Sequence, residues 1–186
     1  MNREPRPLFT KGMALAANAG VTPGQAVEIG FGDGTETLAL LGAGWRVLAV
    51  DPTPQAAELL EQQVPPDGRD RLEIRVAPAQ SLELPPFDLL YAGFALSFLE
   101  PADFRRFWTG VRAALRPGGV VIVNVFGVRD TWARDAAMTF VEREAVERMA
   151  SGLEVLALDE EDRDGDSFVG RKHWHVFDLV ARRPAG

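Results

Sequence analysis

The chain has 186 residues, of which 46% are hydrophobic and 25% charged, with a formal net charge of −7 and no cysteine. This composition is that of an ordinary globular domain with a substantial core. The acidic balance argues against a nucleic-acid-binding protein, since such proteins carry a basic face. Without cysteine, the chain has no disulfides, no zinc sites with thiolate ligands and no cysteine nucleophile.

We expect a single domain over residues 1–186, in which residues 1–20 form an N-terminal extension and a short helix. The segment from Met1 to Thr10 is polar and contains prolines, so it lacks the apolar centre of a signal peptide. No apolar run approaches the length of a membrane span. The expected location is the cytoplasm, with no membrane partner, and the sequence does not indicate an oligomeric state.

Strand-like and helix-like segments alternate along the chain, a pattern typical of a parallel sheet covered by helices on both faces. Prolines and glycines mark the boundaries, as in the turn Pro65-Pro66-Asp67-Gly68 and the helix end Arg116-Pro117-Gly118-Gly119. In chain order the pattern predicts a helix at about 10–20, a strand at 25–30, a helix near 35–43, a strand at 45–50, a helix at 54–63, strands at 72–76 and 87–91, a helix from 101 to 115 and a strand at 120–126.

The pattern changes beyond Gly127. A helix at about 139–150 precedes a strand at 153–158, and a polar loop from Asp159 to Gly170 leads to a last strand at about 172–182. Because no helix separates these two late strands, we expect them to form an antiparallel hairpin.

The most informative segment is Val27-Glu28-Ile29-Gly30-Phe31-Gly32-Asp33-Gly34, in which an apolar run ends in an acid and three alternate glycines follow. A second apolar run ends in Asp51, about twenty residues later. Glycines allow a sharp turn and close approach to a ligand, and an acid after the second strand can bind both hydroxyls of a ribose. The pattern therefore predicts a site for a nucleoside cofactor.

The spacing of the glycines argues against a dinucleotide. The dinucleotide fingerprint needs glycine at its sixth position, where this chain has Thr35, and the negative charge of Asp33 in the loop would repel a pyrophosphate. Two acids, Glu28 and Asp33, instead suit a ligand that carries an ammonium and a sulfonium.

The segment from Glu28 to Gly34 closely resembles the first motif of the class I S-adenosylmethionine-dependent methyltransferases. The resemblance covers nearly the whole chain, through Asp51, the strand Phe87-Asp88-Leu89-Leu90-Tyr91 and the run Leu115-Arg116-Pro117-Gly118-Gly119. It implies an α/β, Rossmann-like class I methyltransferase fold, with a mostly parallel seven-stranded sheet, helices on both faces and a C-terminal antiparallel hairpin. The C-terminal part, with Trp132 and Lys172-His173-Trp174-His175, looks like small bacterial methyltransferases, some of which are grouped loosely with tellurite-resistance methyltransferases.

The resemblance implies S-adenosyl-L-methionine as cofactor and methyl transfer to a small-molecule acceptor by in-line displacement. One position departs from the family, because Ala77-Pro78-Ala79-Gln80 stands where many members have an aspartate that meets the adenine amino group. The predicted cofactor-binding residues are Glu28, Gly30, Phe31, Gly32, Gly34, Asp51, Pro52, Ala79, Gln80, Tyr91 and Ala92.

The predicted catalytic residues are His173, His175 and Arg171, at the start of the last strand. That strand should enter from the edge where ligands bind, and histidine is the usual general base near neutral pH. The alternative is that these histidines are packed, hydrogen-bonded residues. A His-x-His metal site completed by Asp159, Glu160 or Asp130 is less favoured, and no metal is predicted.

Four aromatic residues near the same edge, Phe94, Phe98, Trp132 and Trp174, are candidates for lining an acceptor pocket or for core packing. Arg129, like Arg171, is a candidate for orienting an anionic substrate or for surface charge. Three other functions stay open: a methyltransferase-like domain without catalysis, an NAD-type oxidoreductase and a nucleic-acid methyltransferase. The last two are disfavoured, by the glycine spacing and by the acidic balance respectively.

Overall fold

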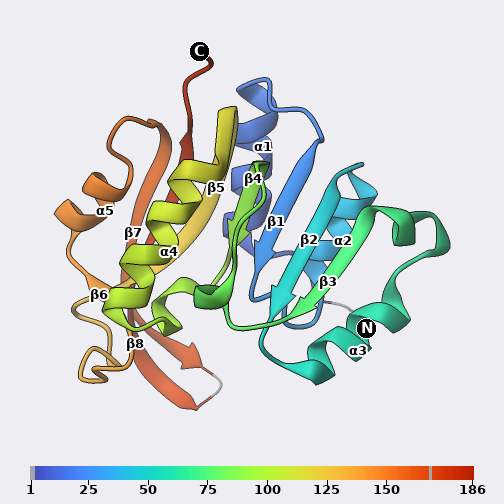
Figure 1. The fold of residues 1–186 in the computed structure, drawn as a ribbon. Coiled ribbons are helices and arrows are strands. Elements are labelled where there is room, and N and C mark those ends of the chain that lie inside the picture. Colours follow the sequence, from blue (N-terminus) through green and yellow to red (C-terminus); the bar gives the residue numbers. More distant parts are fainter. Residues whose placement is uncertain (1–2, 168) are drawn as a thin grey trace.

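The computed structural model describes residues 3–167 and 169–186, so two residues of the predicted N-terminal extension and one of the predicted polar loop lie outside the description. Figure 1 shows a twisted sheet with helices on both faces. The strands run in the order β3-β2-β1-β4-β5-β8-β7, and β6 pairs with β5. The strands are β1 (Gln25–Ile29), β2 (Arg46–Asp51), β3 (Leu72–Val76), β4 (Phe87–Ala92), β5 (Leu115–Gly127), β6 (Phe140–Val141), β7 (Glu154–Ser167) and β8 (Gly170–Arg182).

Strands β1 to β5 are parallel, whereas β8 runs antiparallel to both β5 and β7. The predicted mostly parallel sheet with a terminal antiparallel hairpin is thereby confirmed. The described sheet has eight strands rather than seven, because the short β6 pairs with the end of β5. Among the described residues, no helix combines the length and apolar character needed to cross a bilayer.

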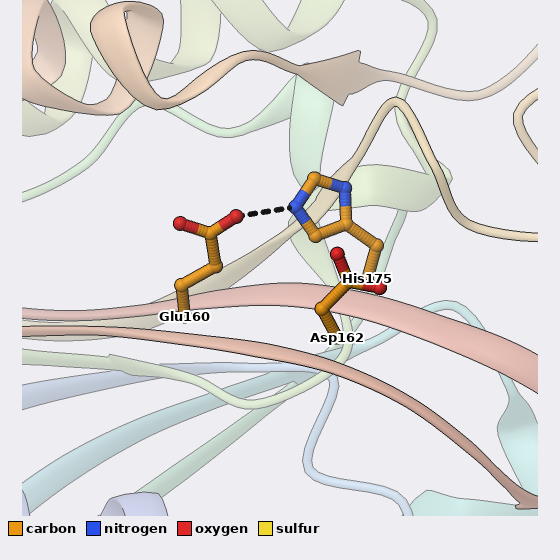
Figure 2. Close-up of side chains that lie close together, drawn as sticks. All are labelled: Glu160, Asp162 and His175. Carbon is orange, nitrogen blue, oxygen red and sulfur yellow. Dashed lines mark hydrogen bonds and ion pairs between the residues drawn. The ribbon is translucent and has the colours of Figure 1, made fainter.

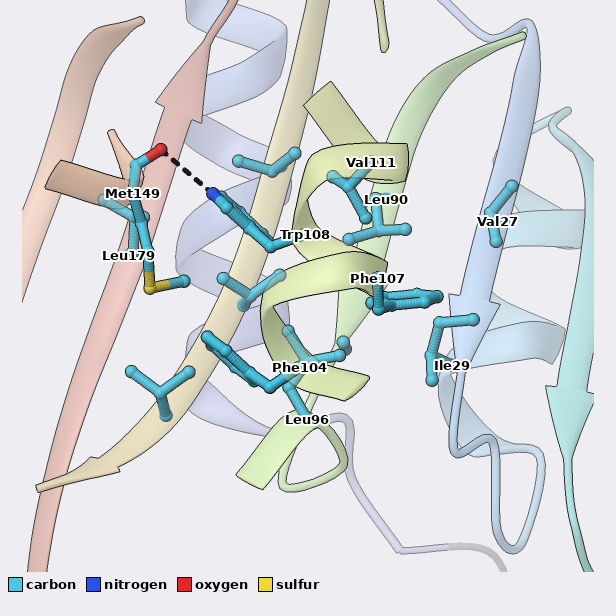
Figure 3. Packing of buried hydrophobic residues seen from close by; sticks show 14 of the residues in the cluster. Val27, Ile29, Leu90, Leu96, Phe104, Phe107, Trp108, Val111, Met149 and Leu179 are labelled. Atoms are coloured by element: carbon cyan, nitrogen blue, oxygen red, sulfur yellow. Dashed lines mark hydrogen bonds between the residues drawn. The ribbon is translucent and has the colours of Figure 1, made fainter. Parts of the chain in front are cut away.

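Helices cover the two faces of the sheet and enclose two apolar cores. The first three helices pack on one face, and the last two on the other, which is the face that Figure 3 shows. The helices are α1 (Pro7–Asn18), α2 (Thr35–Gly42), α3 (Pro54–Gln63), α4 (Pro101–Ala114) and α5 (Arg143–Met149).

Helix α4 shows how local sequence determines this packing. Pro101 occupies the first turn, where its missing N–H leaves no bond unmade. Phe104, Phe107 and Trp108 follow at helical spacing, are buried, and cover strands β1, β4 and β5 (Figure 3). The indole Nε1 of Trp108 donates a hydrogen bond of 3.1 Å to the carbonyl of Met149, which ties α4 to α5.

The C-terminal third differs from the sequence prediction. Strand β7 extends to Ser167 and β8 begins at Gly170, so most of the predicted polar loop at 159–170 is strand. Residues 159–164 of β7 are all charged and exposed, so no alternation of apolar and polar residues marks this part of the strand. Asp162 and Asp164 pair with His173 across the hairpin. Helix α5 is also shorter than predicted, since 140–141 forms β6.

Two further boundaries differ. Strand β5 begins at Leu115, because Leu115 pairs with Phe87 before the register shifts at the Pro-Gly-Gly segment. Helix α1 covers Pro7–Asn18 rather than about 10–20. Between β3 and β4, where no helix was predicted, the chain forms a short 3₁₀ turn, Ala79–Ser81. Strand β1 lies between β2 and β4, so the chain reverses its direction of winding there. In open sheets of this kind, ligands bind at the carboxyl edge beside that reversal.

Candidate functional site

The glycine loop after β1 needs all three of its glycines. Gly30, Gly32 and Gly34 have φ values of 75°, 53° and 79°, in the left-handed region that residues with a Cβ rarely adopt. A Cβ on Gly30 would come within 2.7 Å of the Cβ of Ala95. The loop therefore turns directly from the end of β1 into α2, for which Gly34 is the N-cap.

Asp51, at the end of β2, fastens this loop. Its Oδ2 accepts the main-chain N–H of Gly32 at 3.1 Å, and its Oδ1 accepts that of Thr53 at 2.9 Å. The carboxylate is thus held between the glycine loop and the start of α3, at the carboxyl edge of the sheet.

A cavity of about 420 Å³ opens at this edge. Its volume is within the range of small-molecule sites. Of the predicted cofactor-binding residues, those that line it are Gly30, Asp51, Pro52, Ala79 and Gln80. The segment after β4 supplies further lining residues that the cofactor prediction omitted, namely Phe94, Ala95, Phe98 and Leu99. The one feature of the sequence that indicated these residues is their position just beyond the carboxyl end of a central strand.

The other predicted cofactor residues do not line this cavity; they are Glu28, Phe31, Gly32, Gly34, Tyr91 and Ala92. Glu28 is fully buried beneath the loop, and its Oε2 accepts a hydrogen bond of 2.5 Å from the hydroxyl of Thr37. Its Oε1 has no hydrogen-bond partner among the described residues. Burial raises the pKa of Glu28 to about 8, so near neutral pH this carboxyl binds a proton in the folded chain.

The N-terminal segment covers the outside of the glycine loop. The guanidinium of Arg3 lies 3.0 Å from the carboxylate of Asp33 and 2.5 Å from that of Glu36. Glu36 also accepts the main-chain N–H of Arg6 at 2.9 Å. The negative charge of Asp33, expected from the sequence to face a cationic ligand, is therefore already paired with Arg3.

A second cavity, of about 380 Å³, adjoins the first, and we call it the aromatic pocket. It is lined by Arg6, Phe94, Phe98, Phe126, Trp132 and Trp174. Phe94 and Phe98 line both cavities. The four aromatic residues named as acceptor-site candidates thus come together here, with Phe126 added from β5.

Phe94 separates the two cavities in a strained conformation. Its φ is 56°, the one positive value among the described non-glycine residues. The side-chain oxygen of Asn124, on β5, accepts the main-chain N–H of Phe94 at 2.7 Å. Backbone strain of this kind persists where surrounding contacts impose it, and it is often found at functional sites.

The structure places the predicted catalytic residues away from both cavities. Side chains alternate along β8, so Trp174 points into the aromatic pocket while its neighbours point to the opposite face. His173 lies 2.5 Å from Asp162 and 2.9 Å from Asp164, which raise the pKa of its imidazole. Arg171 is exposed at the start of the strand. None of the three lines either cavity.

His175 is fully buried in a hydrogen-bonded cluster on that opposite face (Figure 2). Its Nδ1 accepts the main-chain N–H of Arg129 at 3.1 Å, so the ring proton lies on Nε2, which is 3.0 Å from Glu160. Bonds from His175, Arg143 and Arg129 lower the pKa of Glu160 to about 2. His175 is therefore surrounded as expected for the alternative given above, in which it is a packed, hydrogen-bonded residue.

Glu160, Asp162 and His175 offer ligand atoms within 4.8 Å of one another, a spacing that a metal ion could bridge. The guanidinium of Arg129 already contacts all three, at 2.6 Å from each carboxylate and 2.9 Å from the imidazole. These carboxylates therefore face a cation that the chain itself supplies. Arg129, a predicted substrate-orienting residue, takes this role.

A family model described as a methyltransferase domain matches residues 27–121, which are 95 of the 186 residues. This stretch contains the glycine loop, Asp51 and the strands that bear the first cavity. The chain belongs to this family. The resemblance to class I S-adenosylmethionine-dependent methyltransferases is thereby confirmed. No curated protein sequence matches this methyltransferase chain.

Solved structures share its fold at low sequence identity. TehB from Haemophilus influenzae has a TM-score of 0.75 and 15% identity over 92% of this chain, which spans only 62% of TehB. The N-methyltransferase NodS from Bradyrhizobium japonicum WM9, in complex with S-adenosyl-L-homocysteine, has a TM-score of 0.71 and 18% identity, with 96% of this chain and 89% of NodS covered. A SAM-dependent methyltransferase from Methanosarcina mazei has a TM-score of 0.70 and 19% identity, with 99% and 100% covered.

Proposed function

We propose that this methyltransferase binds S-adenosylmethionine in the cavity at the carboxyl edge of β1 and β2, and methylates a small molecule held in the adjoining aromatic pocket. The observation that carries the proposal is the shared wall of Phe94 and Phe98 between the two cavities. One cavity lies beside the glycine loop and Asp51, and the other is lined mainly by rings, so a donor and an acceptor would meet at that wall.

The residues around the first cavity suit this cofactor. Asp51 presents a carboxylate where a ribose would lie, and Ala79 and Gln80 offer backbone and amide groups for an adenine edge. The three left-handed glycines leave the loop backbone without side chains that would block a ligand. NodS, which shares the fold, was crystallised with S-adenosyl-L-homocysteine.

When bound, the cofactor supplies a methyl group on a sulfonium, so the chemistry needs neither a metal nor a covalent intermediate with the protein. What the chain has to supply is alignment of the acceptor with that methyl group and exclusion of water. Such positioning can contribute on the order of 7–11 kcal/mol to lowering the barrier. The rings of the aromatic pocket are suited to both tasks.

The test is calorimetric titration with S-adenosylmethionine and S-adenosylhomocysteine, comparing the wild type with Asp51→Ala. Hydrogen bonds to charged groups contribute about 1.5–3 kcal/mol, so Asp51→Ala should weaken binding roughly 10- to 100-fold. Glu58→Ala, which removes an exposed acid from α3, is the matched control and should bind normally.

A folded Asp51→Ala protein with unchanged affinity would contradict the role given to Asp51. Lack of binding by the wild type would contradict the proposed function as a whole. Tight cofactor binding without product from any acceptor class would instead support a domain that binds the cofactor without catalysis. NADH serves as the ligand of the oxidoreductase alternative and should not bind.

A further inference from the structure

The aromatic pocket also indicates which acceptors the enzyme takes, an inference that rests on the proposed function. Among the described residues five rings line the pocket, and they contact one another, with centroids 5.8 Å apart for Trp132 and Trp174 and 5.7 Å for Phe94 and Trp174. Such a pocket fits the flat apolar body of a small molecule. Rings in this arrangement are also the usual receptor for an ammonium group, so the charge around them decides which ligand they suit.

The ring faces are already in contact with a cation. Lys172 is buried, with its Nζ 3.4 Å from the ring centroid of Trp132, 3.9 Å from that of Trp174 and 5.0 Å from that of Phe126. A cation attracted to an aromatic ring uses the negative potential of the ring face. A second ammonium in the pocket would have to share those rings with Lys172, which already occupies their faces.

Lys172 is held in place by Asp130. Their side chains are 2% and 0% exposed, and Nζ lies 2.5 Å from Oδ1. Asp130 also accepts the main-chain N–H groups of Trp132, at 3.0 Å, and His175, at 3.3 Å. Burial lowers the pKa of Lys172, but the ion pair with Asp130 opposes that effect and favours the charged ammonium.

The rim of the pocket carries a second cation. The guanidinium of Arg6 lies 5.7 Å from the ring centroid of Phe94, and no carboxylate is among the lining residues that the structure describes. Its nearest acid, Glu36, is 3.7 Å away but is bound more closely by Arg3, at 2.5 Å. An anion in the pocket would therefore meet the guanidinium of Arg6 directly, whereas the ammonium of Lys172, paired with Asp130, lies against the rings of Trp132 and Trp174 and is not a lining residue.

We propose that the aromatic pocket selects a small acceptor with a flat apolar body and an acidic nucleophile, a thiol or a phenolic hydroxyl, and selects against amines. The acceptor loses its S–H or O–H proton to water and reacts as the anion that Arg6 stabilises. The electron pair left on its sulfur or oxygen forms the bond to the methyl carbon, and the pair of the broken carbon–sulfur bond stays on the cofactor sulfur. The products are a thioether or ether and S-adenosylhomocysteine, and no protein base is required.

The first experiment compares phenylmethanethiol, benzyl alcohol and benzylammonium, which differ only in the group attached to the same benzyl body. Binding to the protein saturated with S-adenosylhomocysteine is followed by quenching of tryptophan fluorescence, since Trp132 and Trp174 line the pocket. We expect the thiol and the alcohol to bind at least tenfold more tightly than benzylammonium. Equal or tighter binding of benzylammonium would overturn the inference.

Turnover with S-adenosylmethionine then separates this inference from the proposed function. Formation of S-adenosylhomocysteine with benzenethiol or a phenol, and not with benzylamine, supports both proposals. Turnover with benzylamine alone would refute the acceptor class while leaving methyl transfer intact. Failure of the wild type to bind S-adenosylhomocysteine would refute the proposed function itself.

Two variants test the cations separately. Lys172→Met combined with Asp130→Asn removes the buried ammonium without leaving a lone buried carboxylate, and should reduce the discrimination against benzylammonium to about threefold or less. Arg6→Gln, at a half-buried position, should weaken binding of the anion benzoate severalfold, whereas Arg134→Gln should not, because Arg134 is exposed and lines only a neighbouring cavity. If the double variant fails to fold, the comparison of Arg6→Gln with Arg134→Gln still tests the inference. Unchanged benzoate binding by Arg6→Gln would contradict it.

Discussion

At the scale of single residues, Glu28 is a fully buried carboxyl beneath the glycine loop whose hydrogen bonding is incomplete. Its carboxyl has one bond, from Thr37, and one oxygen without a partner among the described residues. A charged carboxylate there would lose its hydration with little in return, which is why folding raises its pKa from 4.5 to about 8. Because the folded chain holds this proton more tightly than the unfolded chain, the residue costs stability as the pH rises from about 4.5 to about 8.

This linkage predicts a pH-dependent effect of Glu28→Gln. Measured without cofactor, the variant and the wild type should have similar free energies of unfolding near pH 4.5, and the variant should be more stable by on the order of 3 kcal/mol at pH 8. Urea unfolding at a series of pH values gives the comparison. Glu58→Gln, at an exposed position, should show no such divergence, and parallel pH profiles for Glu28→Gln and wild type would refute the assignment.

The same residue marks a limit of sequence-based prediction. The pattern of glycines and acids identified the loop and Asp51, since a strand, a turn and a second strand leave few places for those side chains. Whether an acid at the end of a strand faces the ligand or the helix beneath the loop depends on the pleat and on residues such as Thr37. The side chain of Glu28 points to helix α2, where Thr37 lies, and Asp51 lines the cavity.

At the scale of elements, α4 owes its position to its buried aromatic face. Phe107→Ala should destabilise the protein by about 3–5 kcal/mol, because truncation leaves a cavity among residues of β1, β4 and β5 (Figure 3). Arg105→Ala, on the exposed face of the same helix, should change stability by less than about 0.5 kcal/mol. Chemical denaturation measures both. A small cost for Phe107→Ala would show that the helix packs loosely.

The apolar pattern located α4 and the central parallel strands well, because α4 buries one face and these strands are apolar runs buried on both faces. It failed at β7, where the strand runs past Asp159 with charged residues whose partners lie on β8 and in the Arg129 segment. Their stabilising contacts are long-range ion pairs, which a local pattern does not reveal. The same limit applies to the surroundings of the two histidines. Their strand was placed correctly, but the carboxylates of β7 that contact them were assigned to a loop.

At the scale of the whole molecule, the first cavity lies over the line where the winding of the sheet reverses and has lining residues from both sides of it, so a ligand there would join both halves. A ligand that binds only the folded state stabilises it, by about 2.7 kcal/mol at a concentration of one hundred times its Kd. For a chain of this size, S-adenosylhomocysteine at that concentration should raise Tm by roughly 5–10 °C. Differential scanning calorimetry tests this, with NADH as the ligand that should leave Tm unchanged.

The alternation along β8 separates two chemistries by a single residue. Trp174 faces the pocket, while His173 and His175 face the carboxylates of β7. The end of the strand from Val176 onward is fixed by its ladder with β5. One residue inserted just before Val176, without a bulge, would keep that ladder and turn every upstream side chain to the other face. An imidazole would then enter the pocket in place of an indole, so this scaffold stands one codon insertion from an enzyme that carries its own base.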